Sequence, residues 1–153
     1  MHIEALPTDL VRSLQKGGKD AHGNLPQCAV SSGVGTPCRH CLRNVPEGET
    51  FLILAHRPFA DLHPYAECGP IFLCAAACER GGGSEVLPPV LKTSATYLVK
   101  AYDDREWIIY GTGAITPSDR IIDRAATLMN DSKVAFVDVR SASNNCYLAR
   151  ITR

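Results

Sequence analysis

The sequence lacks long apolar segments and has no net charge. No run of apolar residues approaches the roughly 18 that a membrane helix needs, so no transmembrane segment is predicted. Residues 1–7 lack a basic region followed by an apolar stretch, so no signal peptide is predicted and we expect a cytoplasmic protein. Sixteen Lys and Arg balance sixteen Asp and Glu, which argues against a nucleic-acid partner.

Complete signatures of catalysis or nucleotide binding are also missing. Gly33 and Gly35 lack the preceding strand, the third glycine and the helix of a dinucleotide fingerprint. The glycine run 81–83 is predicted to be a flexible break and lacks the Gly-Lys-Ser/Thr that completes a phosphate loop. No Ser, His and Asp set can be assembled, and no second carboxylate pairs convincingly with Glu67. Whether the protein is an enzyme is therefore left open.

The length and composition predict one globular domain over residues 1–153. A chain of 153 residues with 45% hydrophobic content can bury a core without needing metal or disulfides. Apolar strands are predicted at 51–56, 71–74, 97–102, 107–110, 134–139 and 146–151. With two helices, these predict an α+β fold whose sheet is mainly antiparallel, with about six strands and an irregular N-terminal third.

Capping and turn residues place the helices and one hairpin. The first helix is predicted to start at Thr8 as N-cap and to end before Gly17. The second is predicted after Thr116 as cap, with Pro117 in its first turn. The polar residues 103–106 predict a hairpin that joins the strands 97–102 and 107–110.

The cysteines carry the clearest chemical signal. There are seven, an odd number, so they cannot all pair within the chain, and thiols or metal ligands are favoured in a reducing compartment. Cys38 and Cys41 form a C-x-x-C knuckle, whose tight turn can bring two thiolates to one zinc ion. Cys74 and Cys78 are the candidates for the other two ligands. His56 and Cys68 are possible substitutes.

Other interpretations of these residues stay open. Cys74 follows Phe72 on a strand and fits a plain core position. A redox pair at Cys38 and Cys41 is disfavoured, because Pro46 and the glycine at 48 follow too closely for the helix that such motifs use. His40 is expected to face solvent rather than metal. A histidine that closes an apolar strand is more often structural than catalytic, and this applies to His56.

A second group of candidates could bind a ligand. Tyr65 and Glu67 lie in one loop and could line a pocket. On a regular strand, Cys146 and Arg150 point the same way. The opposite, apolar face would consist of Tyr147, Ala149 and Ile151. An arginine so placed could hold an anion beside a thiol, although a surface arginine on a half-solvated sheet is the simpler interpretation.

Several stretches of the sequence, in their order and spacing along the chain, resemble a bacterial family known as domain of unknown function 1203. These stretches are Pro37–Leu42, Pro64–Glu67, Gly69–Phe72, Lys100–Asp103, Val134–Val137 and Cys146–Ile151. The resemblance covers nearly the whole chain from Pro37 onward and brings no established activity. It implies two features: a zinc site confined to the branch with the full Cys-Arg-His-Cys knuckle, and a locus shared by the family at Cys38, Arg39, Cys146 and Arg150.

The sequence thus predicts a binding or accessory domain with a structural zinc at Cys38, Cys41, Cys74 and Cys78. The alternative is a thiol-dependent enzyme or anion-binding site that uses Cys38 with Arg39 and Arg150. A third hypothesis is a plain interaction domain with core cysteines. The partner would be a small molecule or a protein, with no nucleic acid and no membrane.

Overall fold

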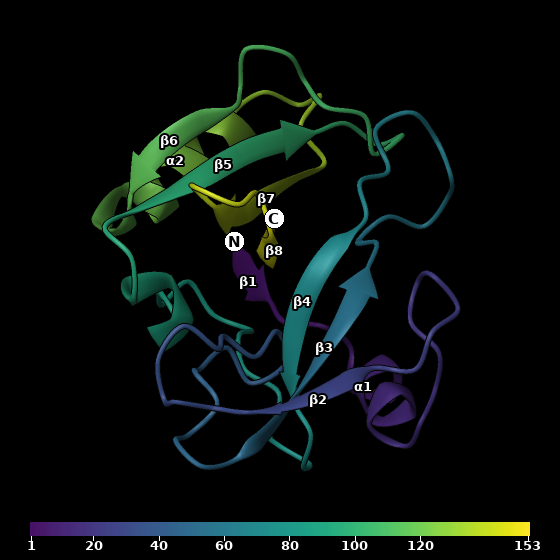
Figure 1. Ribbon diagram of the computed structural model, residues 1–153. Coiled ribbons are helices and arrows are strands. Elements are labelled where there is room, and N and C mark those ends of the chain that lie inside the picture. Colours follow the sequence, from purple (N-terminus) through teal and green to yellow (C-terminus); the bar gives the residue numbers. More distant parts are fainter.

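A computed structural model describes residues 1–153, and its strands form two antiparallel sheets (Figure 1). The five-stranded sheet has the order β1-β8-β7-β5-β6, and the three-stranded sheet has the order β2-β3-β4. With two α-helices beside these strands, the α+β fold is confirmed. Neither helix has the length and apolar character needed to cross a membrane.

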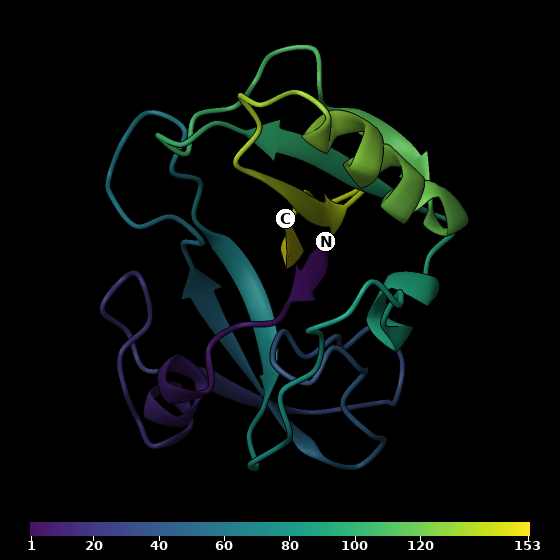
Figure 2. The same cartoon turned by 180° about the vertical axis from the view of Figure 1, so that it is seen from behind.

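The five-stranded sheet joins the two ends of the chain. Its strands are β1 (His2–Glu4), β5 (Thr96–Tyr102), β6 (Ala114–Pro117), β7 (Phe136–Ser141) and β8 (Tyr147–Thr152). A short 3-10 turn, η2 (Ser118–Arg120), leads into helix α2 (Ile121–Met129), which covers one face of this sheet (Figure 2). Apolar residues of α2 such as Ala125 pack there against Val99, Val137 and Val139.

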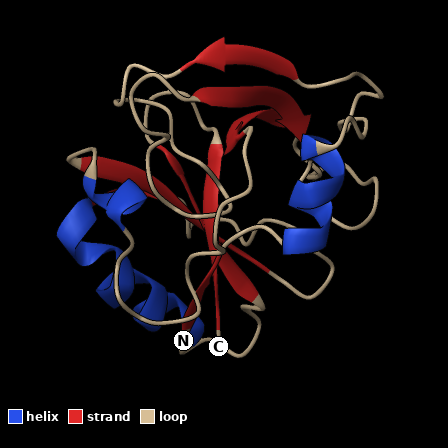
Figure 3. Ribbon diagram, turned by 90° about the horizontal axis from the view of Figure 1, so that it is seen from below, coloured by secondary structure: helices blue, strands red, loops and turns tan.

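The three-stranded sheet carries the N-terminal half. It consists of β2 (Gln27–Val30), β3 (Thr50–His56) and β4 (Gly69–Cys74), with helix α1 (Thr8–Gln15) beside it and the 3-10 turn η1 (Pro89–Lys92) further along the chain. Seen from below, the helices flank the strands (Figure 3). Val11 and Leu14 of α1 belong to the same core cluster as Leu54 and Ile71 of this sheet, and Tyr147 of β8 joins that cluster too. Tyr147 therefore ties the two sheets together.

Several local predictions differ from the structure. Pro7 rather than Thr8 is the N-cap of α1. Thr116 and Pro117 end strand β6 instead of starting a helix. Residues 107–110 form no strand beyond a single bridge from Ile108 to Tyr102, and β5 pairs instead with β6 and β7. Strand β2, which the sequence did not predict, lies in the stretch expected to be irregular.

The glycine run 81–83 is packed rather than a loose break. The Gly81 amide donates to the His40 carbonyl at 2.8 Å, and the Gly83 amide donates to the Ile3 carbonyl at 2.8 Å. A side chain at position 81 would overlap the Cys41 carbonyl. Only glycine allows this close approach, so the run holds strand β1 against the cysteine knuckle.

Candidate metal centre

The knuckle is a tight turn that ends in a short bridge. The Cys38 amide donates to the Arg43 carbonyl at 2.9 Å and the Leu42 amide donates to the Cys38 carbonyl at 3.0 Å, while Pro37 and Asn44 form an antiparallel bridge. Leu42 has φ 55, an uncommon conformation for a leucine, and is fully buried. The turn is therefore fixed by the backbone and by packing.

Strand β4 and the loop after it bring the second cysteine pair to this turn. Cys38 forms a bridge to Phe72, and the Cys74 amide donates to the Cys38 sulfur at 3.3 Å. The Cys41 and Cys74 sulfurs are 3.9 Å apart. All four sulfurs, those of Cys38, Cys41, Cys74 and Cys78, lie within 4.8 Å of one another. The structure thus brings together a four-cysteine cluster that could hold a metal ion.

The substitute ligands lie elsewhere. Neither His56 nor Cys68 belongs to the group of possible metal ligands, and Cys68 is an exposed free thiol. Cys74 is 6% exposed and packs in the apolar core, as a plain core cysteine would, but its sulfur also faces the cluster.

The electrostatics of the cluster favour one negative charge among the four sulfurs. Hydrogen bonds from the Cys41 and Cys74 thiols lower the pKa of Cys38. The same contacts, with burial, raise the pKa of Cys74. Burial and the Cys38 charge raise the pKa of Cys78 to about 12. Four thiolates at this distance require a cation, because like charges so close disfavour one another.

His40 is buried, which corrects the expectation that it faces solvent. Its ring is 0% exposed; Nδ1 lies 3.1 Å from the Cys78 sulfur, and Nε2 lies 3.0 Å from the Thr8 hydroxyl. Burial lowers the pKa of His40, so the neutral ring is favoured. A neutral ring can donate from Nδ1 to the sulfur and accept from Thr8 at Nε2. The hydroxyl that the sequence assigned to capping α1 contacts this ring instead.

Helix α1 also holds the loop that contains Cys78. The Gln15 side-chain amide donates to the carbonyls of Cys74 and Ala76, both at 2.8 Å, and Arg12 donates to the Cys78 carbonyl. These bonds satisfy carbonyls at the end of β4 and in the irregular segment that follows it. The sequence offered no signal for this support, since the contacts join residues about 60 positions apart.

Arg39, next to Cys38, faces away from the sulfurs into a separate cavity. The cavity has a volume of about 300 Å³, and Cys146 also lines it. The Arg39 side chain is 3% exposed, and burial lowers its pKa to about 10. The structure therefore brings Arg39 and Cys146 together, while the Cys38 side chain is fully buried and does not line this cavity.

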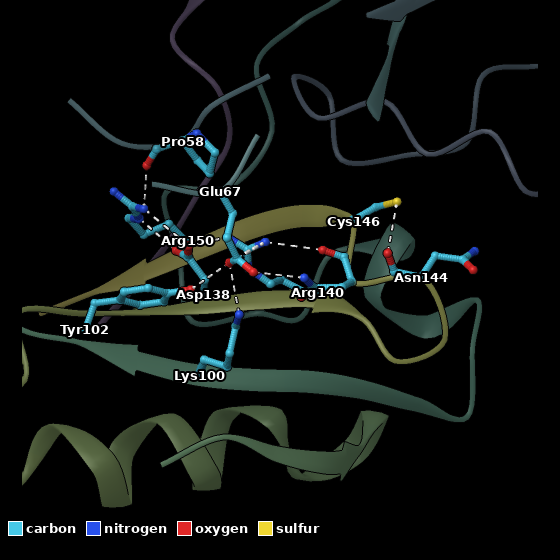
Figure 4. Close-up of polar contacts among 10 residues, drawn as sticks. Pro58, Glu67, Lys100, Tyr102, Asp138, Arg140, Asn144, Cys146 and Arg150 are labelled. Carbon is cyan, nitrogen blue, oxygen red and sulfur yellow. Dashed lines mark hydrogen bonds and ion pairs between the residues drawn. The ribbon is translucent and has the colours of Figure 1, made fainter. Parts of the chain in front are cut away.

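Arg150 does not line the cavity that Cys146 lines, and strand β8 is irregular between them. The pairing of β7 with β8 slips near Arg140, so that Tyr147 stands opposite Arg140 and Arg150 stands opposite Asp138. This bulge turns Tyr147 to the same face as Arg150. The expectation that Tyr147 occupies the opposite face was therefore wrong. Arg150 binds the buried Asp138 carboxylate at 2.8 Å and the Pro58 carbonyl at 2.7 Å (Figure 4).

Glu67 joins a charged cluster that the sequence did not reveal. Its carboxylate contacts Lys100 at 3.0 Å and Arg140 at 3.2 Å (Figure 4). It also accepts a hydrogen bond from the Asn145 amide at 3.0 Å. Burial raises the pKa of Glu67, but Arg140, Asn145 and Lys100 together lower it below its ordinary value. One signal was present: Asp138 lies between two valines on the predicted strand 134–139, directly before Arg140, and a charged residue is unusual at such a position.

Tyr65 and His56 lie outside both the cysteine cluster and the Arg39 cavity. The Tyr65 ring packs on Trp107 with centroids 4.9 Å apart, and its hydroxyl contacts that of Tyr110. The His56 ring lies 5.7 Å from that of Tyr147, and its Nε2 atom is buried without a hydrogen-bond partner. Burial and the nearby arginines, first among them Arg39, lower the pKa of His56 to about 4.

Comparison with known proteins identifies a family and nothing closer. Residues 35–153 match a family described as protein of unknown function DUF1203. No curated protein and no solved structure matches the chain. The matched part contains the four-cysteine cluster and the Arg39 cavity, while β1, α1 and β2 precede it. The chain belongs to the DUF1203 family.

Proposed function

We propose that this protein binds zinc at the four-cysteine cluster and that the zinc has a structural role in a binding or accessory protein. The convergence of four sulfurs from two separate segments carries this proposal. Zinc–sulfur bonds of about 2.3 Å in a tetrahedron put neighbouring sulfurs about 3.8 Å apart. The Cys41 and Cys74 sulfurs are 3.9 Å apart, close to that spacing.

The ligand set favours zinc and a structural role. Thiolates are soft ligands, and a tetrahedral set of four is typical of zinc or iron–sulfur sites rather than of magnesium or calcium. Four protein ligands fill a tetrahedral zinc and leave no position for substrate, whereas catalytic zinc keeps one open. Amide and imidazole donors to the Cys38 and Cys78 sulfurs are the outer contacts that such thiolates use.

The burial of Cys38 disfavours the alternative of a thiol-dependent enzyme. A nucleophilic cysteine must meet its substrate, and reactive cysteines are partly exposed. The Cys38 side chain is 0% exposed and its sulfur faces three other cysteines. The hypothesis of a plain interaction domain with core cysteines does not explain why four sulfurs lie so close together.

Metal analysis of protein purified without a histidine tag tests the proposal. We expect one zinc per chain, displacement by cobalt with the absorption of a tetrahedral sulfur site, and loss of binding in the Cys41→Ser and Cys74→Ser variants. Cys28 and Cys68 are exposed and outside the cluster, so Cys28→Ser and Cys68→Ser are matched controls that keep the metal. Metal-free protein whose four cluster thiols titrate freely, even after incubation with zinc, contradicts the proposal. If the bound metal were iron, the proposal of zinc would be wrong, while the four cysteines would still be the ligands.

A further inference from the structure

The Arg39 guanidinium is buried without a carboxylate partner. Its Nε atom donates to the Tyr147 carbonyl at 2.7 Å and its Nη1 atom donates to the Pro37 carbonyl at 2.5 Å. Its Nη2 atom makes no hydrogen bond or ion pair within the chain. The polar atoms that are both shielded from solvent and without a partner do not include Nη2, so solvent reaches this atom. Arg39 therefore keeps one donor group free and accessible, although the side chain is only 3% exposed.

Arg140 provides the comparison within the same protein. These two arginines are the only Arg or Lys side chains in the buried class. Arg140 lies 3.2 Å from the Glu67 carboxylate and 3.6 Å from that of Asp138. Arg39 has no ion pair, and backbone carbonyls are its only hydrogen-bond acceptors. Burial of a cation is costly without a carboxylate partner. Cys146 and Cys38 offset this cost only in part, since the pKa of Arg39 stays lowered, so Arg39 lacks an anionic partner that Arg140 has.

The cavity beside Arg39 has the size and lining of a small-ligand site. Its volume of about 300 Å³ lies at the lower end of the range for ligand pockets. Phe72 of β4, Val90 of η1 and Leu148 of β8 supply apolar surface, and Ser94 and Asn144 add polar groups. No acidic residue and no second cation lines the cavity. Arg39 is thus the only charge that a ligand there would meet.

We propose that this cavity binds a small monocarboxylate whose apolar part packs against Phe72, Val90 and Leu148, with its carboxylate on Arg39. A guanidinium is planar and donates in the geometry that a carboxylate accepts. A single cation matches the single charge of a carboxylate, whereas a phosphate dianion would be left with an uncompensated charge. The site is separate from the cysteine cluster, and the inference does not rest on the proposed zinc.

Binding of benzoate, butyrate and 3-phenylpropionate to the whole protein, followed by calorimetry and by NMR, tests the charge requirement. We expect saturable binding of at least one of these carboxylates, and binding of its uncharged amide to be weaker by about tenfold or more, since a hydrogen bond between charged groups is lost. In Arg39→Gln the preference for acid over amide should disappear. Equal binding of acid and amide overturns the inference. So does failure of all three acids to bind at about 10 mM, where weak small-ligand sites are still occupied. Tighter binding of inorganic phosphate than of any carboxylate rejects the ligand class.

Cys146 supplies a second test that leaves Arg39 untouched, in case the Arg39 variant does not fold. Cys146 lines the cavity and is half-buried, while Cys28 and Cys68 are exposed elsewhere. A bound carboxylate should slow alkylation of Cys146 by iodoacetamide severalfold and leave the alkylation of Cys28 and Cys68 unchanged, as followed by peptide mass spectrometry. The Cys146→Phe variant should fill the cavity and abolish binding, and Cys68→Phe should not. Unchanged binding in Cys146→Phe, or equal slowing at all three cysteines, overturns the inference.

Discussion

The imidazole of His40, which is 0% exposed, and the half-buried sulfur of Cys78 lie 3.1 Å apart. The other ring nitrogen is held by Thr8, whose hydroxyl lies 3.0 Å away. This arrangement fixes the orientation of the ring through residues of two distant segments. It also makes His40 a residue that supports the proposed metal site without being one of its ligands.

Removal of His40 should weaken metal binding without abolishing it. The His40→Ala variant loses the donor to the Cys78 sulfur, and loss of such an outer contact typically lowers metal affinity by about 10- to 100-fold. Thr8→Val, which removes the partner of the other nitrogen, should have a smaller effect in the same direction. Competition with a chromophoric chelator measures both. His22 is exposed, so His22→Ala is the control; a His40→Ala protein with unchanged affinity would contradict the assigned role.

Metal removal should loosen one part of the protein selectively. Structural zinc contributes on the order of 10 kcal/mol to the segments that it joins. Hydrogen exchange with and without chelator should therefore show faster exchange at the amides of Leu42, Cys74 and Gly81, which bond to the knuckle or lie beside it. The amides of strands β5 and β7, which pair with each other away from the cluster, should change little. Uniform acceleration, or none, would contradict a local structural role.

His56 should make the protein less stable in mild acid. The pKa of this group is about 4 in the folded protein and 6.5 ordinarily, because burial and the charges of Arg39, Arg150 and Arg140 disfavour its cation. Between these two values the unfolded chain binds the proton and the folded chain does not, so the free energy of unfolding falls as pH drops from about 6.5 towards 4, by up to about 3 kcal/mol.

The His56→Gln variant checks this expectation, because glutamine does not titrate. Denaturant unfolding at several pH values should show a smaller dependence on pH between 4 and 6.5 in the variant than in the original protein. His22→Gln, at an exposed position, should keep the original dependence. Parallel curves for His56→Gln and the original protein would show that another group controls the acid response.

Arg150 should be important for stability rather than for binding an anion. Its partner Asp138 is 0% exposed, so Arg150→Met leaves a buried carboxylate with only the more distant Arg140 nearby. We expect a loss of about 3 kcal/mol in the free energy of unfolding. The exposed pair of Arg120 and Asp123 is the matched control, and Arg120→Met should have little effect. Part of the loss should be recovered when Asp138→Asn is combined with Arg150→Met.

The sequence predicted those features that depend on local pattern. Apolar runs identified strands β3, β4, β7 and β8, and the C-x-x-C spacing identified the knuckle. The sequence pattern did not predict strand β2, because three of its four residues are exposed and it has no alternating apolar face. Residues 107–110 have the apolar character of a strand, but only Ile108 pairs with β5, at Tyr102, while β6 pairs with the first part of β5.

The sequence predicted that the two cysteine pairs come together, but other parts of the candidate sites depend on contacts that local pattern does not show. The slip between β7 and β8 reversed the faces of Tyr147 and Arg150, since alternation assumes a regular strand. The pairing of His40 with Cys78 and of Arg39 with the cavity depends on contacts between distant segments. Spacing along the chain holds no information on such contacts.

The pairing of β1 with β8 has a consequence for how the protein is made. Glu4 and Thr152 contact each other across 148 positions, so β1 cannot pair until β8 has been synthesised. At ordinary rates of translation the delay is about ten seconds or more. Ile3, which is 1% exposed in the finished fold, stays without its sheet during this time. Closure of the five-stranded sheet is therefore a late event in folding, and its long-range contacts favour a slow final step.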